Sequence, residues 1–77
     1  MSIQIKYFAS LRERMGRGED AIPAQEARTV ADVWARVSGG RALPGNTLVA
    51  VNMEYSRLDS AVGDGDEVAF FPPVTGG

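Results

Sequence analysis

The chain has 77 residues, of which 44% are hydrophobic and 23% are charged, so it has room for one small domain. Its formal net charge of −2 gives no broad attraction to nucleic-acid backbones or anionic membranes, and we expect neither as a partner. His and Cys are both absent, which excludes disulfide scaffolds, thiolate zinc sites and catalysis by the commonest side-chain base or by a cysteine nucleophile.

The chain opens with the alternation expected of a strand that has one buried face, because Ile3, Ile5 and Tyr7 are separated by polar residues. A short helix is predicted over 9–15 and is ended by Gly16. The opening has neither the basic lead nor the apolar run of a signal peptide, and no segment approaches the roughly 20 apolar residues that span a bilayer. We therefore expect a cytoplasmic protein.

The clearest helix signal follows a weak strand predicted over 19–23. Its apolar positions are spaced i, i+3, i+4, i+7 and are Val30, Val33, Trp34 and Val37. Thr29 precedes them as the N-cap residue, and Asp32 at the third helical position comes close to a capping box. The glycine pair at 39–40 ends the helix. We interpret Trp34 as a core residue because it lies on this apolar stripe.

The second half of the chain predicts mainly strands. In order, these segments are a loop over 41–46, a buried strand over 47–53, a short hairpin partner over 54–57, a tight turn over 62–66 and a last strand over 67–71. One amphipathic helix can bury its stripe only against one face of a sheet. We therefore predict an α+β fold of the ubiquitin-like β-grasp type, with one main helix on a mixed sheet and the first and last strands side by side. This single domain covers residues 1–77 and includes a flexible tail over 72–77.

Three short motifs have a plain structural interpretation. The acidic run at 64–67 lacks the spacing of a calcium loop and is interpreted as a tight turn. The glycines within 16–18 and 39–40 do not join a strand to a helix as phosphate loops do, so we interpret them as helix ends. The arginines within 12–20 are diluted by acidic neighbours and are expected to form a solvated face.

Two aromatic residues are predicted on the outer face of the sheet. If the alternating residues of the first strand point inward, Phe8 lies outside beside Lys6. The same parity in the last strand places Phe71 outside while Val68 and Phe70 point inward. Scattered exposed apolar side chains are normal on protein surfaces, but two aromatics on neighbouring strands favour a docking patch.

The end of the chain predicts a second functional feature. Pro72 and Pro73 favour an extended path away from the sheet, and the four residues 74–77 could reach roughly 13 Å at about 3.3 Å per residue. Glycines at the tip can enter a narrow channel in another protein. The terminal carboxyl, with a pKa of about 3.5, is ionised and a poor electrophile, so its use in a reaction requires an activating enzyme, typically one that forms an acyl-adenylate.

The sequence resembles, over its whole length, the family of small, sulfur-carrier subunits of molybdopterin synthase. The residues that carry the resemblance are Tyr7-Phe8-Ala9, Leu11-Arg12-Glu13, Gly16, Thr29-Val30, Asn52, Asp64-Gly65-Asp66-Glu67-Val68 and the ending Pro72-Pro73-Val74-Thr75-Gly76-Gly77. The resemblance implies a β-grasp fold and a cycle in which a ubiquitin-activating-like adenylyltransferase adenylates the Gly77 carboxylate. A sulfurtransferase then supplies the sulfur that converts it to a thiocarboxylate.

The resemblance also implies a heterotetramer of two small and two large molybdopterin synthase subunits. In it the inserted tail donates its sulfur to cyclic pyranopterin monophosphate, and two such carriers in turn complete molybdopterin. The catalytic groups of that family belong to the large subunit, so this chain alone is expected to be non-catalytic. No cofactor or metal is expected on it, since the adenylate and the thiocarboxylate are transient covalent states.

The resemblance assigns roles to particular residues of this chain. Gly76 and Gly77 form the reactive tail. Phe8 and Phe71 fall in the docking surface, and Arg12 contributes polar contacts there. The other residues assigned to partner binding are Tyr55, at a position that the family usually fills with an apolar residue, and Pro72, Pro73, Val74 and Thr75 of the tail.

Three alternatives remain open at this point. The chain could be a ubiquitin-like modifier whose Gly77 forms isopeptide bonds with lysines of target proteins. It could be a thiamine-pathway sulfur carrier, although such carriers resemble a more minimal β-grasp and lack the stretch seen here over 7–13. It could also be a binding module whose aromatic face docks a partner while the tail is inert.

Overall fold

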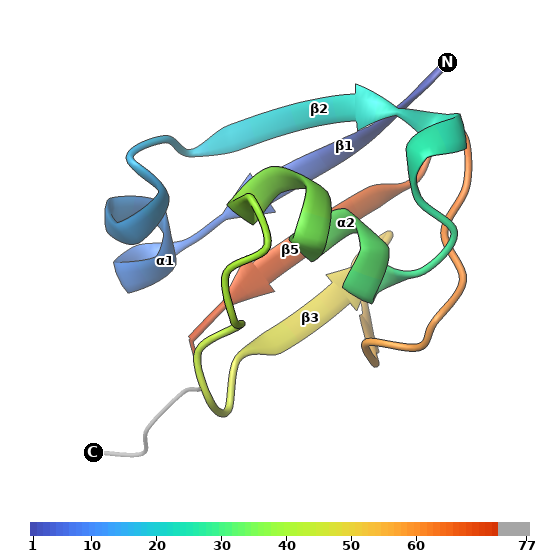
Figure 1. Cartoon of the computed structure of the whole chain (residues 1–77). Coiled ribbons are helices and arrows are strands. Elements are labelled where there is room, and N and C mark those ends of the chain that lie inside the picture. The colour runs from blue at the N-terminus through green and yellow to red at the C-terminus, as the bar shows by residue number, and fades with distance from the viewer. Residues whose placement is uncertain (73–77) are drawn as a thin grey trace.

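A mixed sheet with one helix packed across it forms the body of the molecule (Figure 1). The computed structural model describes residues 1–72, and 73–77 lie outside the described residues. The elements are β1 (Ser2–Tyr7), α1 (Ala9–Met15), β2 (Glu19–Pro23), the 3₁₀ turn η1 (Ala24–Glu26), α2 (Val30–Ser38), β3 (Leu48–Val51), β4 (Glu54–Ser56) and β5 (Glu67–Phe71). Among the helices of residues 1–72, none combines the length and the hydropathy that a membrane-spanning helix requires.

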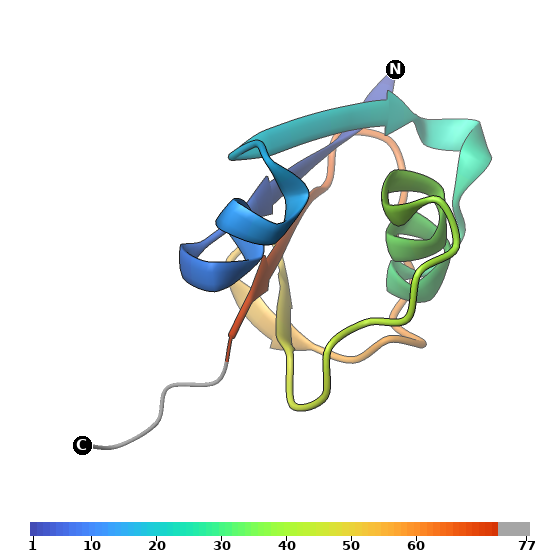
Figure 2. The same cartoon turned by 60° about the vertical axis from the view of Figure 1, so that its left-hand side comes forward.

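The strand order is β2-β1-β5-β3-β4 within the described part of the chain. β1 and β5 are parallel neighbours at the centre, as the sequence predicts, and the other pairs are antiparallel. α2 covers one face of this sheet, whereas α1 lies at the end where β1 finishes (Figures 1 and 2). The predicted β-grasp arrangement is confirmed. Because β1 and β5 are parallel, both finish at the end of the sheet where α1 lies (Figure 1).

α2 forms where the capping residues and the apolar stripe coincide. The Thr29 hydroxyl accepts a hydrogen bond from the Asp32 amide at 3.2 Å, and the Asp32 carboxylate accepts one from the Thr29 amide at 3.2 Å. This is a complete capping box, which satisfies amide groups that the first helical turn leaves without partners. Gly39 ends the helix with a left-handed φ of 71°.

The core lies between α2 and the inner face of the two central strands. Ile3, Ile5, Val68 and Phe70 are each 0% exposed, and Tyr7 is 1% exposed. The Phe70 ring stacks beside Tyr7 with 6.3 Å between ring centroids and meets Trp34 edge-on at 5.1 Å. Trp34 is therefore a core residue, as predicted.

The strand predicted over 47–53 is shorter in the structure and ends at Val51. Asn52 and Met53 instead form the turn to β4, with φ angles of 51° and 69°. The Asn52 side chain donates to the Asp66 carboxylate at 2.9 Å and accepts from the Glu67 amide at 3.0 Å. The hairpin is thereby tied to the turn before β5, which explains why a residue predicted in a strand lies in a turn. The predicted partner strand over 54–57 likewise ends one residue earlier, at Ser56.

Candidate functional site

Three aromatic side chains gather on the sheet face that α2 does not cover. Phe71 of β5 meets Phe8 edge-on, with 6.4 Å between ring centroids, and lies 5.9 Å from the ring of Tyr55 on β4. Phe8 is 48% exposed and Tyr55 is 76% exposed, while Phe71 between them is half-buried. We call Phe8, Tyr55 and Phe71 the aromatic patch. The predicted outward direction of Phe8 and Phe71 is confirmed.

Strand register brings these residues together. Ala50 of β3 pairs with Ala69 of β5 on one side and with Tyr55 of β4 on the other, so the three lie in one row across the sheet. Phe71, two residues after Ala69, is on the same face at the next outward position. Small side chains thus fill the row beside the exposed rings. This arrangement presents an apolar surface of the kind that partner proteins bind.

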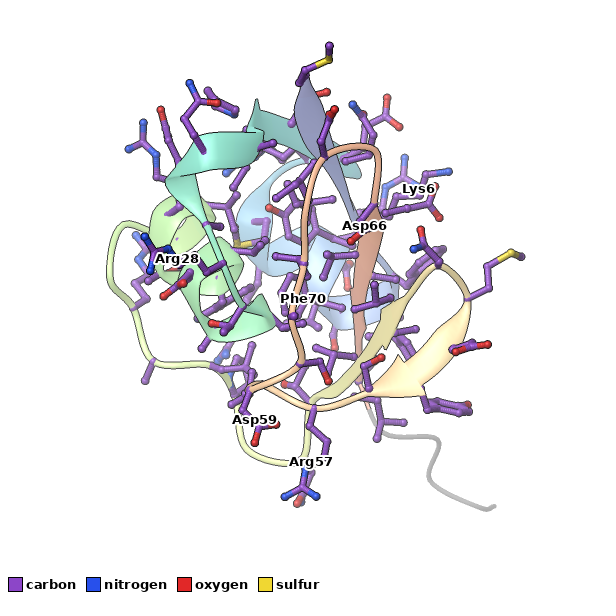
Figure 3. All side chains as sticks on the ribbon, turned by 90° about the vertical axis from the view of Figure 1, so that its right-hand side faces the viewer. Lys6, Arg28, Arg57, Asp59, Asp66 and Phe70 are labelled. Carbon is purple, nitrogen blue, oxygen red and sulfur yellow. The ribbon has the colours of Figure 1, made fainter. Side chains whose placement is uncertain are left out.

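A charged pair borders the patch on the central strands. Lys6 lies 3.6 Å from the Glu67 carboxylate, and both side chains are exposed on the outer face. Figure 3 shows Lys6 pointing away from the interior in which Phe70 lies. An exposed pair of this kind contributes little to stability, so we interpret it as part of the polar rim around the patch.

The backbone holds Phe8 firmly at the junction of β1 and α1. Its amide donates to the Phe70 carbonyl at 3.2 Å, and its own carbonyl accepts from the amides of Leu11 and Arg12. Phe8 is the N-cap residue of α1 in an extended conformation, and Ala9 follows with an unusual φ of 51°. The exposed ring is therefore carried by a rigid backbone. Sequence reasoning found Phe8 by parity, but no sequence signal indicated the left-handed φ at Ala9.

Arg12, predicted to contribute polar contacts in the docking surface, lies in the last turn of α1. Its guanidinium is next to Gly18, where an added Cβ would stand 3.1 Å from Nε. No described hydrogen bond or ion pair joins Arg12 to the aromatic patch. The structure therefore places Arg12 against the loop between α1 and β2, and its predicted role in partner contact stays a prediction.

The tail begins at the end of β5, near α1. Pro72 is half-buried and lines a hollow together with Leu11 and Pro44. The remaining predicted tail residues, Pro73, Val74, Thr75, Gly76 and Gly77, lie outside the described residues. The aromatic patch and the base of the tail share one strand, because Phe71 directly precedes Pro72.

The acidic run at 64–67 forms a tight turn, as predicted. The Asp66 carboxylate accepts hydrogen bonds from the Asn52 amide group and, at 2.8 Å, from the Gly63 backbone amide. These bonds, that of Asn52 foremost, hold the pKa of Asp66 below its ordinary value. Within residues 1–72, no three acidic side chains are grouped so that they could hold a metal ion.

The buried phenol of Tyr7 has a strongly shifted pKa. Burial, and then the nearby Asp20 carboxylate, raises the pKa of Tyr7 to about 12. Its hydroxyl lies 3.4 Å from Asp20, to which it donates a hydrogen bond. A phenol with this pKa stays protonated at neutral pH, so Tyr7 is a structural group and not a base.

Comparison with known proteins gives matches over nearly the whole chain. A family described as the ThiS family matches residues 5–77. The molybdopterin synthase sulfur carrier subunit of Haemophilus influenzae is 42% identical over 82 residues, covering 97% of this chain and 99% of that protein. The crystal structure of SAMP1 from Haloferax volcanii aligns with a TM-score of 0.82 and 30% identity, covering 100% of both chains.

A further match comes from a solved complex of subunits 1 and 2 of the molybdopterin-converting factor from Helicobacter pylori 26695. It aligns with a TM-score of 0.67 and 22% identity, covering 100% of both chains. Similarity at this level of identity shows a shared fold. Together with SAMP1, it establishes that the architecture described above is the ubiquitin-like β-grasp.

Proposed function

Because the chain belongs to the ThiS family, we propose that it acts as the sulfur carrier subunit of a molybdopterin synthase, with Gly77 as the residue that carries the sulfur. The observation that supports this most is the 42% identity to a carrier of that name along essentially the whole chain. The ThiS family match also extends to residue 77, so it includes the Gly76-Gly77 ending.

The proposed chemistry takes place at the last main-chain carboxylate. At neutral pH this group is ionised and resists attack, so an adenylyltransferase first joins it to AMP. A sulfurtransferase then supplies sulfur to the activated carbonyl carbon, AMP leaves, and a terminal thiocarboxylate results. Its sulfur is a good nucleophile and would convert cyclic pyranopterin monophosphate to molybdopterin in the synthase.

The catalytic groups of this cycle would come from partner proteins. The chain has no His and no Cys, and the Tyr7 phenol is buried and protonated. A non-catalytic carrier needs only a surface that binds its partners and a tail that reaches their active sites. This requirement explains how a 77-residue chain can take part in sulfur transfer.

The aromatic patch is the surface that we assign to binding of the large synthase subunit. Phe71 lies at its centre, packed between Phe8 and Tyr55, and aromatic residues at interface centres commonly dominate binding energy. Phe71 is also the last residue before Pro72, so a partner bound to the patch would be next to the tail. Pro73, Val74 and Thr75 are proposed to occupy the partner's channel together with the terminal glycines.

Mass spectrometry of the intact chain tests the proposal. Protein incubated with its adenylyltransferase, a sulfurtransferase and ATP should exchange one oxygen for sulfur, and tandem fragmentation should place the sulfur on Gly77. Deletion of Gly77 should abolish the exchange, whereas Met53→Ala, at an exposed turn away from the tail, should leave it intact. Sulfur on another residue, or no exchange under these conditions, would show that the chain is not a sulfur carrier.

A ubiquitin-like modifier is the second candidate, supported by the similarity to SAMP1, the small archaeal modifier protein 1 of Haloferax volcanii. In that function the activated Gly77 would form isopeptide bonds with lysines of other proteins. Conjugates of higher mass that survive denaturation and reductant would indicate it. Their loss in a chain lacking Gly77 would identify the terminal carboxylate as the linking group.

A further inference from the structure

Three hollows in the described part of the molecule adjoin along α1. They measure about 330, 330 and 300 Å³ and share lining residues: Arg14 lines all three, Pro44 lines the first two, and Met15 and Arg41 line the last two. The hollows extend from Pro72 along α1 to the loop after α2, and their lining also includes Leu11, Met15, Arg17, Trp34, Arg41 and Pro44. Figure 1 shows α1, this loop and the end of β5 at one end of the sheet. We call these adjoining hollows the arginine groove.

Hydrogen bonds fix the backbone of Arg41 at the far end of the groove. The indole N–H of Trp34 donates to the Arg41 carbonyl at 2.8 Å, and the Arg41 amide donates to the Ser38 hydroxyl at 3.1 Å. The amide of the preceding Gly40 donates to the Ala35 carbonyl at 3.0 Å. The loop therefore holds Arg41 in a defined place beside the core, which favours recognition of a specific ligand.

Arg17 connects the two walls of the groove. Its guanidinium donates to the Val37 carbonyl at 3.0 Å, to the Met15 carbonyl at 3.3 Å and to the Asp20 carboxylate at 2.7 Å. The end of α1 is thereby joined to the end of α2. Because Asp20 offsets its charge, Arg17 acts as a positioning residue and leaves Arg14 and Arg41 as the main positive charges of the groove.

These two arginines are not neutralised by the rest of the described chain. Both are exposed, and neither forms an ion pair within residues 1–72. No residue that lines the three hollows is acidic. A positive groove therefore lies at the base of the tail in a chain whose formal net charge is −2. Such local concentration of charge attracts carboxylates and disfavours basic partners.

We propose that the arginine groove binds an acidic segment of the large synthase subunit that also carries apolar side chains. Its carboxylates would pair with Arg14 and Arg41, since guanidinium groups match carboxylates in geometry and charge. Its apolar side chains would contact the half-buried side chains of Met15, Pro44 and Pro72. The adjoining hollows are lined by apolar residues as well as by arginines, which suits a peptide better than a bare phosphate. This inference rests on the proposed function, because the partner that receives the tail at Pro72 is the one that would reach the groove.

The test compares two double variants with the same change in charge. Arg14→Glu with Arg41→Glu should weaken binding of the cognate large subunit by about tenfold or more and reduce its dependence on salt, measured by calorimetry at low and high salt. Arg28→Glu with Arg57→Glu alters arginines on the side away from α1 (Figure 3) and should change affinity less than about twofold. Arg14→Gln with Arg41→Gln, a milder pair, should give an intermediate loss while thermal unfolding stays close to wild type.

Measuring thiocarboxylate formation in the same variants distinguishes a failure of this inference from a failure of the proposed function. The Arg14→Glu, Arg41→Glu chain should still gain sulfur as wild type does, because the groove is assigned to the large subunit alone. The groove is not a docking site if the wild-type chain gains sulfur but the two glutamate double variants bind the large subunit with the same affinity. Loss of sulfur gain with intact binding would assign the groove to the adenylyltransferase and overturn the proposal. If inorganic phosphate binds at Arg14 and Arg41 but does not change the affinity for the large subunit, the groove is a small-anion site and the proposal is overturned.

Discussion

Two consecutive aromatic residues stand at the ends of both central strands, and the members of each pair face opposite sides of the sheet. Tyr7 and Phe70 are buried in the core, being 1% and 0% exposed, whereas Phe8 and Phe71 lie on the outer face. The same residue type therefore forms the core in one position and the aromatic patch in the next. Alternation along a strand alone accounts for the difference.

The two faces differ in what covers them. On the inner face, Trp34 of α2 meets Phe70 edge-on and encloses it. On the outer face, no element of residues 1–72 covers the rings of Phe8 and Tyr55. Apolar area that stays exposed can still contribute to binding when a partner covers it. The inner rings are therefore expected to determine folding and the outer rings binding, and the following experiments test this division.

The largest effect is expected from Phe70→Ala, which removes the central ring of the core. Truncating a buried Phe costs about 3–5 kcal/mol of unfolding free energy. A 77-residue domain is stabilised by roughly 4–12 kcal/mol in total at 0.05–0.15 kcal/mol per residue, so this variant should lose a large part of its stability and melt at a clearly lower temperature. Phe71→Ala, one residue later, should cost only about 1 kcal/mol, the value of the exposed ring contacts. If chemical denaturation shows equal losses of unfolding free energy in the two variants, the division between folding and binding rings is wrong.

The aromatic patch should show the opposite order when binding is measured. Phe71→Ala should weaken association with the cognate large subunit by about 2 kcal/mol, because this ring lies between the other two. Phe8→Ala and Tyr55→Ala should each weaken it by less, and all three chains should remain folded by circular dichroism. Isothermal titration gives the affinities. If the affinity is unchanged in all three variants, the aromatic patch is not part of the interface, although it is exposed.

Sequence alone could predict the faces of the long strands but not the full extent of the patch. Alternation over β1 and β5 correctly placed Phe8 and Phe71 outside. β4 has only three residues, too few for alternation to indicate a face, and register with Ala50 is what places Tyr55 beside Phe71. Only the resemblance to a known family predicted Tyr55 as a partner-binding residue.

The arginine groove shows a second limit of sequence reasoning. Arg17 was expected on a solvated helix face, yet it donates to the Val37 carbonyl, 20 residues further along the chain. Arg41 lies in a segment predicted only as a loop, and its position depends on the Trp34 indole. Contacts of this kind arise from the packing of distant elements and leave no periodic pattern. The helices and strands were therefore predictable, whereas this groove required the structure.

The position of α2 over the inner face depends on its cap, and Thr29→Ala should destabilise the fold by about 1 kcal/mol. The variant removes the acceptor for the Asp32 amide and leaves the core residues in place. Urea denaturation should show a lower midpoint with an unchanged slope. Thr29→Ser, which keeps the hydroxyl, should recover most of the loss. A similar loss in both variants would mean that the methyl group and not the cap is responsible.

The same cap should make stability depend on acidity. Backbone amides of Arg28 and Thr29 donate to the Asp32 carboxylate and hold its pKa below the ordinary value of about 3.9. The unfolded chain therefore binds the proton more readily than the folded chain does. The stabilisation is present above the ordinary pKa and is lost as pH falls through the lower, folded value. Denaturation midpoints below pH about 4 should decline less steeply in Asp32→Asn than in wild type.

The smallest expected effect is a gain in stability at the turn that carries Tyr55 to the outer face. Met53 is 92% exposed and has a φ of 69°, in a two-residue turn with Asn52 at 51°. Asn-Gly is the favoured sequence for two-residue turns with positive φ at both positions, because glycine adopts this conformation without steric cost. Met53→Gly should therefore raise the unfolding free energy by up to about 1 kcal/mol, visible as a higher melting temperature. Met53→Ala keeps a Cβ at the strained position and should give no gain. Equal gains in both variants would show that loss of the exposed thioether, and not relief of backbone strain, stabilises the hairpin.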